Sequence, residues 1–265
     1  LADKHGAILS RIPKKETLVE GDMTHAHHLT TPAWAPKKDL VAAIHDLCAL
    51  GVIRSEGELC DLFQQQGRHR MFGQESQKSV FSDSDSLQFW MGLVSMWMIA
   101  VHERHAAEFD SKMASFAKPG EFHAAPGVKG FSRVMAKAFE YKDEYGLQGF
   151  EEQVLSPFYV IDVLRCMFIV PDAERLLEIR EALIQEVTNA RTKNGYNTAA
   201  KAARGYRDMK LNPLFSCGEY GKVFTEVQLV LTENEEAKKK SHFLYELIRG
   251  DFSKGDIDAQ ALTPP

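Results

Sequence analysis

The sequence lacks several features that would each point to a particular class of protein. Its four cysteines form no CxxC pair and fit no zinc-ligand spacing, which argues against the common zinc-binding modules. Positive charge is not in excess: the formal net charge is -5, so no global basic field attracts nucleic acid, although local basic clusters can still bind phosphate. The cysteines are expected to be free thiols in a reducing compartment.

The sequence also lacks an apolar run long enough to cross a membrane. The stretch from Leu87 to Val101 is shorter than the roughly 20 residues that a spanning helix needs. It contains Gln88 and Ser95, and it continues directly into a charged segment. This pattern predicts a buried helix, with contact to a membrane or a hydrophobic partner as the alternative, and no transmembrane segment is expected.

The overall composition is that of an ordinary soluble globular protein. Hydrophobic residues make up 44% of the chain and charged residues 26%, and 265 residues suffice for one large domain with or without a helical extension. The first residue is Leu1 rather than Met, and no targeting segment is recognisable. A soluble protein of the plastid or mitochondrion, with its targeting peptide removed, is therefore one expectation.

The N-terminal half is predicted to be an extended arm followed by helices. Three prolines interrupt residues 1–38, which we interpret as an arm lying on another surface. Residues 38–66 have the spacing of two short helices, and the second is acidic, so no DNA binding is expected. A long helix over residues 86–116 is apolar almost all round in its first half, which predicts a central position in the fold.

The C-terminal half mixes helices with strands. Its pattern predicts a helix over 131–146, a buried strand over 158–170, with entry through a helical turn as an alternative for its start, and a helix over 171–191. Two strands then flank the turn at 216–221 as a hairpin, and a last helix closes the chain. The order predicts an α+β protein with a mixed β-sheet flanked by helices. The predicted divisions are an arm (1–38), a helical region (39–123), an α+β domain (124–252) and a tail (253–265).

Four short segments in this half carry a family resemblance. They are PGVKGFSRVMAK (126–137), IDVLRCMFIV (161–170), RGYRDMKLN (204–212) and TEVQLVL (225–231). In this order and spacing they resemble the nucleotidyltransferase-like domain of the RelA/SpoT alarmone synthetases, over about residues 124–252. That family transfers pyrophosphate from ATP to the 3′-hydroxyl of a guanine nucleotide.

The resemblance implies a role for individual residues. Asp162 takes the place of the metal-binding aspartate, and Glu226 that of the catalytic glutamate, so both are expected to hold Mg²⁺ in an active enzyme that uses ATP. Arg165 matches the arginine of the aspartate strand, as a further catalytic residue. The expected substrate-binding residues are Lys129, Lys137, Tyr206 and Lys210. Phosphoryl-type transfer depends mostly on positioning and on neutralising charge, which these groups would supply.

The sequence also departs from the family pattern. Gly127 and Val230 stand where the family has arginines, Lys210 stands in place of a histidine, and Asp208 in place of a serine. At least two cationic contacts are therefore missing, and a lysine does not reproduce the fork of an arginine.

The residues also allow readings that involve no catalysis. Asp162 could cap the following backbone, and Glu226 could pair with Arg207 or Lys210 across the hairpin. Tyr206 could be a packing aromatic, and the two lysines of the first segment a solvated basic face.

Two functions follow from these observations. The first is a divergent RelA/SpoT-like protein that acts as a non-catalytic accessory or scaffold subunit of a larger assembly, which would be organellar if a targeting peptide was removed. Its partners would dock on residues 1–38 and on the 86–116 helix. The alternative is an active ATP-dependent pyrophosphotransferase or nucleotidyltransferase acting on a nucleotide or RNA 3′-hydroxyl. The missing cations favour the first function, and the retained carboxylates favour the second.

Overall fold

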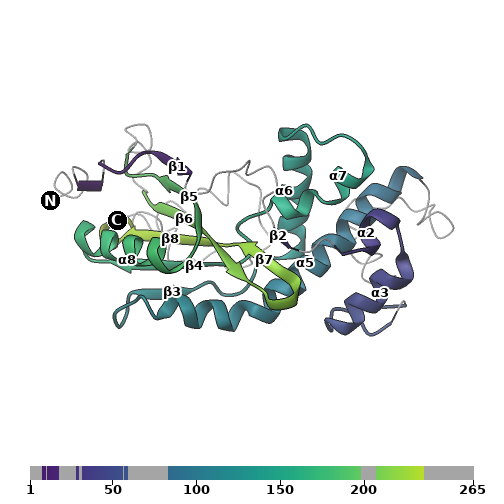
Figure 1. The fold of residues 1–265 in the computed structure, drawn as a ribbon, viewed down its shortest axis with the longest axis horizontal. Coiled ribbons are helices and arrows are strands. Elements are labelled where there is room, and N and C mark those ends of the chain that lie inside the picture. Colours follow the sequence, from purple (N-terminus) through teal and green to yellow (C-terminus); the bar gives the residue numbers. More distant parts are fainter. Residues whose placement is uncertain are drawn as a thin grey trace, which may run out of the picture.

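The protein is built around one mixed β-sheet. The structure is a computed structural model and describes residues 8–9, 11–17, 28–29, 32–55, 57–58, 83–197 and 207–235. Within them the strand order is β1-β5-β6-β8-β4-β3, and β7 joins β6 to β2 (Figure 1). The strands are β1 (Lys15–Thr17), β2 (His28–Leu29), β3 (Phe122–Ala124), β4 (Arg165–Val170), β5 (Asn189–Asn194), β6 (Met209–Ser216), β7 (Gly221–Phe224) and β8 (Glu226–Leu231). The β4–β8 pair is parallel and the other described pairs are antiparallel, which confirms the predicted α+β class.

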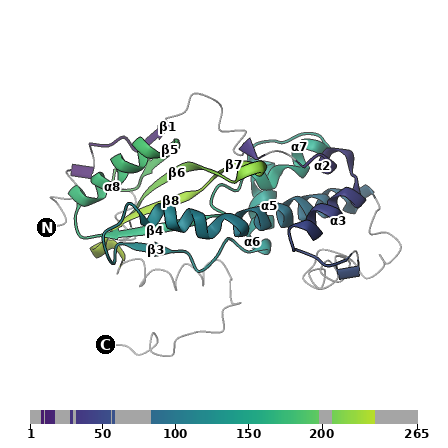
Figure 2. The same cartoon turned by 60° about the horizontal axis from the view of Figure 1, so that its bottom comes forward.

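Helices cover one face of this sheet and continue beyond its end. The helices are α2 (Trp34–Lys37), α3 (Leu40–Ala49), α5 (Asp83–Ala114), α6 (Phe131–Glu144), α7 (Phe150–Val154) and α8 (Ala173–Glu186), with 3-10 turns η2 (Ser156–Tyr159) and η4 (Gly218–Tyr220). Figure 2 shows α5 running along the sheet and on into the group formed by α2, α3, α6 and α7. One long helix therefore connects the sheet to the helical end of the molecule.

Alternation of side chains along β4 explains why α5 and α8 pack where they do. Residues of β4 alternate between half-buried and buried, and Phe168 and Val170 lie on the buried side. On the same apolar face, Phe109 of α5 meets Phe215 of β6 edge to face, with ring centroids 5.5 Å apart. An ion pair of 2.7 Å between Lys112 of α5 and Glu186 of α8 connects the two covering helices.

The apolar run of α5 lies inside the protein's own core. Its side chains pack with Trp34, whose ring centroid is 6.2 Å from that of Trp90, and the same core cluster extends to Leu231 at the end of β8. The predicted buried helix is therefore observed. No helix in the described part of the chain is both long and apolar enough to cross a membrane. Three cysteines in the described ranges, Cys48, Cys166 and Cys217, are free thiols.

Residues of the N-terminal arm contribute edge strands to the sheet. Strand β1 pairs with β5, and β2 pairs with β7, both in antiparallel register. Leu9 is fully buried, and the Asn194 side chain donates hydrogen bonds to the carbonyl oxygens of Leu9 and Ile12, at 2.8 and 3.1 Å. The described parts of the arm up to Leu29 therefore lie on the sheet of the same chain, whereas α2, at the end of the arm, packs at the helical end, where Trp34 meets Trp90 of α5.

Two sequence predictions about secondary structure were wrong, and a third is met by its alternative. The strand predicted over 158–170 begins at Arg165, and residues 156–159 form the 3-10 turn η2, which agrees with a strand entered through a helical turn. The helix predicted to reach residue 191 ends at Glu186, because Val187 is extended and β5 pairs with β6 from Asn189 onward. Strand β3 lies in a segment predicted to be an irregular break, and its pairing with β4 supplies the missing hydrogen bonds. Most of the last predicted helix lies outside the described residues.

Candidate functional site

Asp162 and Glu226 lie at the same end of two neighbouring strands. Strands β4 and β8 run parallel, with Arg165 opposite Glu226 in the register. The backbone N–H of Glu226 donates to the carbonyl oxygen of Leu164 at 3.0 Å, which extends this pairing toward the turn that holds Asp162. Because parallel strands begin at the same edge of a sheet, the two carboxylates come together although they are far apart in the sequence.

Asp162 is bound by two lysines through a single oxygen. The Nζ atoms of Lys129 and Lys137 each lie 2.8 Å from Oδ2 of Asp162. Lys129 comes from the loop before α6, where its backbone N–H donates to the carbonyl oxygen of Val163 at 2.9 Å, and Lys137 lies on α6. The side chains of Lys129 and Asp162 are only 5% and 14% exposed, so these charges are largely shielded from water and depend on one another.

The electrostatics of this group follow from burial and pairing together. Burial alone would raise the pKa of Asp162, but the charges of Lys137 and Lys129 outweigh it and lower the pKa from 3.8 to about 2. For Lys129 burial is the larger effect and lowers its pKa, whereas for Lys137 the attraction of Asp162 outweighs burial and raises it. The carboxylate is therefore ionised at neutral pH.

Glu226 has its own partners on the neighbouring strand and on its own strand. Its Oε2 atom accepts from Nζ of Lys210 at 3.2 Å, and its Oε1 atom accepts from the side-chain amide of Gln228 at 2.6 Å. Lys210 also lies 3.7 Å from Asp208. Burial lowers the pKa of Lys210, but Glu226, Asp208 and Asp162 outweigh it and raise the pKa.

The two ion-paired groups form one lysine–carboxylate cluster. Asp162 contributes to the raised pKa of Lys210, and Glu226 contributes to that of Lys137, so each group lies within electrostatic reach of the other. Arg165, on β4, belongs to the same cluster because its charge contributes to the lowered pKa of Lys129. The cluster thus brings together six of the seven residues singled out from the sequence. The seventh, Tyr206, lies outside the described residues.

The sequence did not point to Gln228 as a member of this cluster, and it identified Asp208 only as a departure from the family pattern. Gln228 hydrogen-bonds Glu226 and lies two positions after it on β8, so it shares the same face of the strand. Asp208 is buried, and its backbone carbonyl accepts from the N–H of Gly195 at 2.8 Å. The period of two along a strand was the signal that could have identified Gln228.

Gly127 and Val230 stand where the family pattern has arginines, and each position disfavours an arginine for a different reason. Gly127 is exposed but has φ +151°, a backbone conformation that a residue with a side chain rarely adopts. Val230 is fully buried on the same face of β8 as Glu226, opposite Ile169. An arginine at Val230 would have to bury its charge, and one at Gly127 would strain the backbone, so both positions disfavour an arginine.

The carboxylates of the cluster do not fit a resident magnesium ion. Magnesium prefers hard oxygen ligands and usually takes one or two carboxylates together with waters and substrate phosphates. Here Oδ2 of Asp162 and both oxygens of Glu226 already accept hydrogen bonds from side chains of the protein. No group of three or more His, Cys, Asp or Glu side chains in the described ranges could hold a metal ion. A metal held by Oδ2 of Asp162 and by Glu226 would have to displace lysines, whereas Oδ1 of Asp162 accepts no hydrogen bond from the described residues.

Comparison with known proteins gives a distant structural likeness. No family model matches the chain, and no curated protein matches its sequence. Among solved structures, the chain is similar to the small alarmone synthetase 1 from Bacillus subtilis bound to its product pppGpp. The identity is 12%, the TM-score is 0.42, and the match covers 62% of this chain and 82% of that one. A likeness this distant assigns neither a family nor an activity.

Proposed function

We propose that this chain is a non-catalytic accessory or scaffold protein that carries a divergent RelA/SpoT-like domain. One observation carries the proposal: the carboxylates that would bind metal and activate the acceptor hydroxyl are used as counter-ions for the chain's own lysines. Asp162 holds Lys129 and Lys137, and Glu226 holds Lys210. Charges paired in this way stabilise the fold of the domain, because removing any one of them would leave a poorly solvated partner.

The altered cationic positions support the same conclusion. Pyrophosphate transfer needs positive groups that are aimed at the charge developing in the transition state. Removal of one such donor costs about 3 kcal/mol of transition-state stabilisation. Gly127 and Val230 supply no charge at two of these positions; a side chain at Gly127 would strain the backbone, and one at Val230 would be buried. The combined loss would leave little pyrophosphate transfer.

A role as an accessory subunit requires a docking surface for partners. We place it on residues 1–38 and on the outer side of α5. The apolar run of α5 is buried in the chain's own core, with Leu93 and Val94 fully covered, so only the half-exposed side of this helix is available. Strands β1 and β2 show that segments of the arm already pair with edge strands, and a partner could add to an edge in the same way.

One observation favours the alternative of an ATP-dependent pyrophosphotransferase or nucleotidyltransferase. The Oδ1 atom of Asp162 is buried and accepts no hydrogen bond from the described residues. A buried carboxylate oxygen without a donor is costly, and a ligand could satisfy it. An active site would further require that the lysines exchange Asp162 for nucleotide phosphates when substrate binds.

A turnover assay separates the two functions. The full chain, Glu226→Gln and Glu219→Gln are each incubated with ATP, GTP and Mg²⁺, and phosphorylated products are resolved by anion-exchange chromatography. Glu219 is an exposed turn residue outside the cluster, so it is the matched control. We expect no product above background from any of the three. Product formed by the full chain and by Glu219→Gln, but lost in Glu226→Gln, would establish the enzyme instead.

A further inference from the structure

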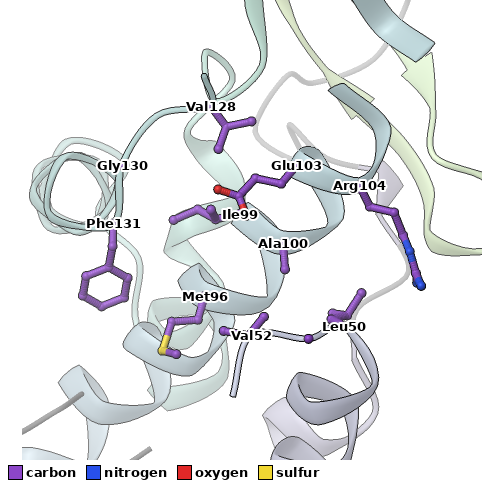
Figure 3. Close-up of a pocket in the computed structure, with 11 residues that line it drawn as sticks. Leu50, Val52, Met96, Ile99, Ala100, Glu103, Arg104, Val128, Gly130 and Phe131 are labelled. Atoms are coloured by element: carbon purple, nitrogen blue, oxygen red, sulfur yellow. The ribbon is translucent and has the colours of Figure 1, made fainter. Parts of the chain in front are cut away.

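A pocket lies apart from the lysine–carboxylate cluster. It has a volume of about 700 Å³ and is enclosed by the turn after α3, the middle of α5 and the start of α6 (Figure 3). This volume is within the range of about 300–1,000 Å³ that small-molecule sites occupy. The walls are mainly apolar, with side chains that include Leu50, Val52, Met96, Ile99 and Phe131.

The charged side chains of this pocket differ in where they point. Figure 3 shows the carboxylate of Glu103 lying toward Ile99 and Val128, whereas the guanidinium of Arg104 extends away from them. Arg104 donates a hydrogen bond to the hydroxyl of Tyr220 at 2.9 Å, which holds it on the outside. Glu103 makes no hydrogen bond or ion pair with any residue in the described ranges. Glu103 is exposed, so the pocket carries one solvent-accessible carboxylate at its rim, beside an apolar wall.

We propose that this pocket binds a small molecule that combines an apolar body with a single cationic amine. The apolar body would gain from leaving water against Met96, Ile99 and Phe131. The amine would pair with Glu103 at the exposed rim of the pocket, through a charge-assisted hydrogen bond that orients the ligand and adds a modest attraction. The first turn of α6 adds a partial positive charge at the Gly130 wall, but it is weaker than the formal charge of a carboxylate.

The pocket shares one short segment with the lysine–carboxylate cluster. Val128 and Gly130 line the pocket, and Lys129 between them binds Asp162. The two sites are therefore formed by opposite sides of the same loop. This site is independent of whether the domain catalyses transfer, because no residue of the pocket is a member of the cluster.

A pair of fluorescent probes tests the charge requirement. Dansylcadaverine has an apolar naphthalene body and a primary amine, and its N-acetyl derivative has the same body without the charge. Each probe is titrated into the full chain and followed by the increase in dansyl fluorescence. We expect saturable binding of the amine, and about threefold weaker binding of the acetylated form.

Three variants locate the site. Glu103→Gln should weaken binding of the amine about threefold and leave binding of the acetylated probe unchanged. Glu108→Gln removes a carboxylate of the same helix that is 71% exposed and does not line the pocket, and it should bind like the parent. Ile99→Trp, which fills the pocket, should weaken both probes. Circular dichroism and thermal unfolding check that each variant is folded.

The outcomes that overturn the proposal are equally specific. They are the absence of saturable amine binding by the parent chain, equal binding of the amine and the acetylated probe, and unchanged amine binding by a folded Glu103→Gln. A loss in Glu108→Gln as large as in Glu103→Gln would show that general surface charge attracts the probe. None of these results depends on the turnover assay, so the pocket and the proposed function can fail separately.

Discussion

Two shielded ion-pair groups in this protein are built in opposite ways. Arg175 of α8 reaches both oxygens of Glu121, at 2.8 to 3.1 Å, and Glu121 also accepts from the backbone N–H of Lys118 at 2.8 Å. In the other group, Asp162 uses one oxygen for Lys129 and Lys137 and leaves its Oδ1 without a hydrogen bond from the described residues.

The difference shows how a structural ion pair can be distinguished from a candidate ligand-binding site. In the Arg175–Glu121 pair every carboxylate oxygen has a donor, as expected of a fork-shaped contact that fastens α8 to the segment before β3. Two lysines compensate the charge of Asp162, but both bind Oδ2, and Oδ1 accepts no hydrogen bond from the described residues. A protein gains no stability from an unsatisfied buried oxygen, so the incomplete group is where a ligand could bind.

The largest expected effect comes from removing the shared carboxylate. Asp162→Ala would leave Lys129 and Lys137 as like charges with little access to water, and we expect the free energy of unfolding to fall by about 3 kcal/mol. Urea denaturation measures the change. Asp143→Ala, at a position whose side chain is 80% exposed, is the control and should change it by less than about 0.5 kcal/mol. An equal loss in the two variants would show that the cluster is not a stabilising unit.

The pH dependence of stability should reveal the same carboxylate. Folding lowers the pKa of Asp162 from 3.8 to about 2, because the two lysines outweigh the effect of burial. The ionised group therefore stabilises the fold at pH values above about 4, by about 2 kcal/mol, and this contribution is lost as the pH falls from 4 toward 2. We expect the stability difference between the parent chain and Asp162→Asn to shrink over that window. A difference that stays constant from pH 6 to pH 2 would contradict the assignment.

The smallest effect is expected in the Arg175–Glu121 pair, when the cation keeps its charge but loses its forked shape. Arg175→Lys retains a cation beside Glu121 but loses the two-pronged contact and the hydrogen bond to the carbonyl oxygen of Phe116. We expect a loss of about 1 kcal/mol in the free energy of unfolding, measured in the same urea series. Lys137→Arg makes the opposite exchange in the lysine–carboxylate cluster, with an arginine in place of a lysine, and is the matched variant. A loss in Arg175→Lys as large as in Asp162→Ala would erase the distinction between the two groups.

Much of the fold could be predicted from local pattern. The apolar run in α5, the amphipathic stretch of α6 and the hairpin of β6 and β7 each follow from a short stretch of sequence. Strand β5 could not be predicted in this way, because residues Asn189–Asn194 continue a segment with helical spacing. Its conformation is decided by pairing with β6 on one side and β1 on the other.

The candidate site was only partly predictable. The choice of Asp162 and Glu226 rested on short motifs, and a pair between Glu226 and Lys210 was among the alternatives left open by the residues. That both lysines of the first motif converge on one oxygen of Asp162 had no signal in the sequence, since they lie 25 and 33 positions away from it.

The sequence by itself determined most of the helical and extended segments, with β3 and β5 as exceptions, together with the apolar faces and the available charged residues, because these depend on neighbours within a few positions. The tertiary structure alone decided which lysine neutralises which carboxylate, which oxygen is left without a donor, and that Glu103 faces an apolar wall. Those properties depend on distance through space and on exclusion of water, and both arise only when segments far apart in the chain are packed together.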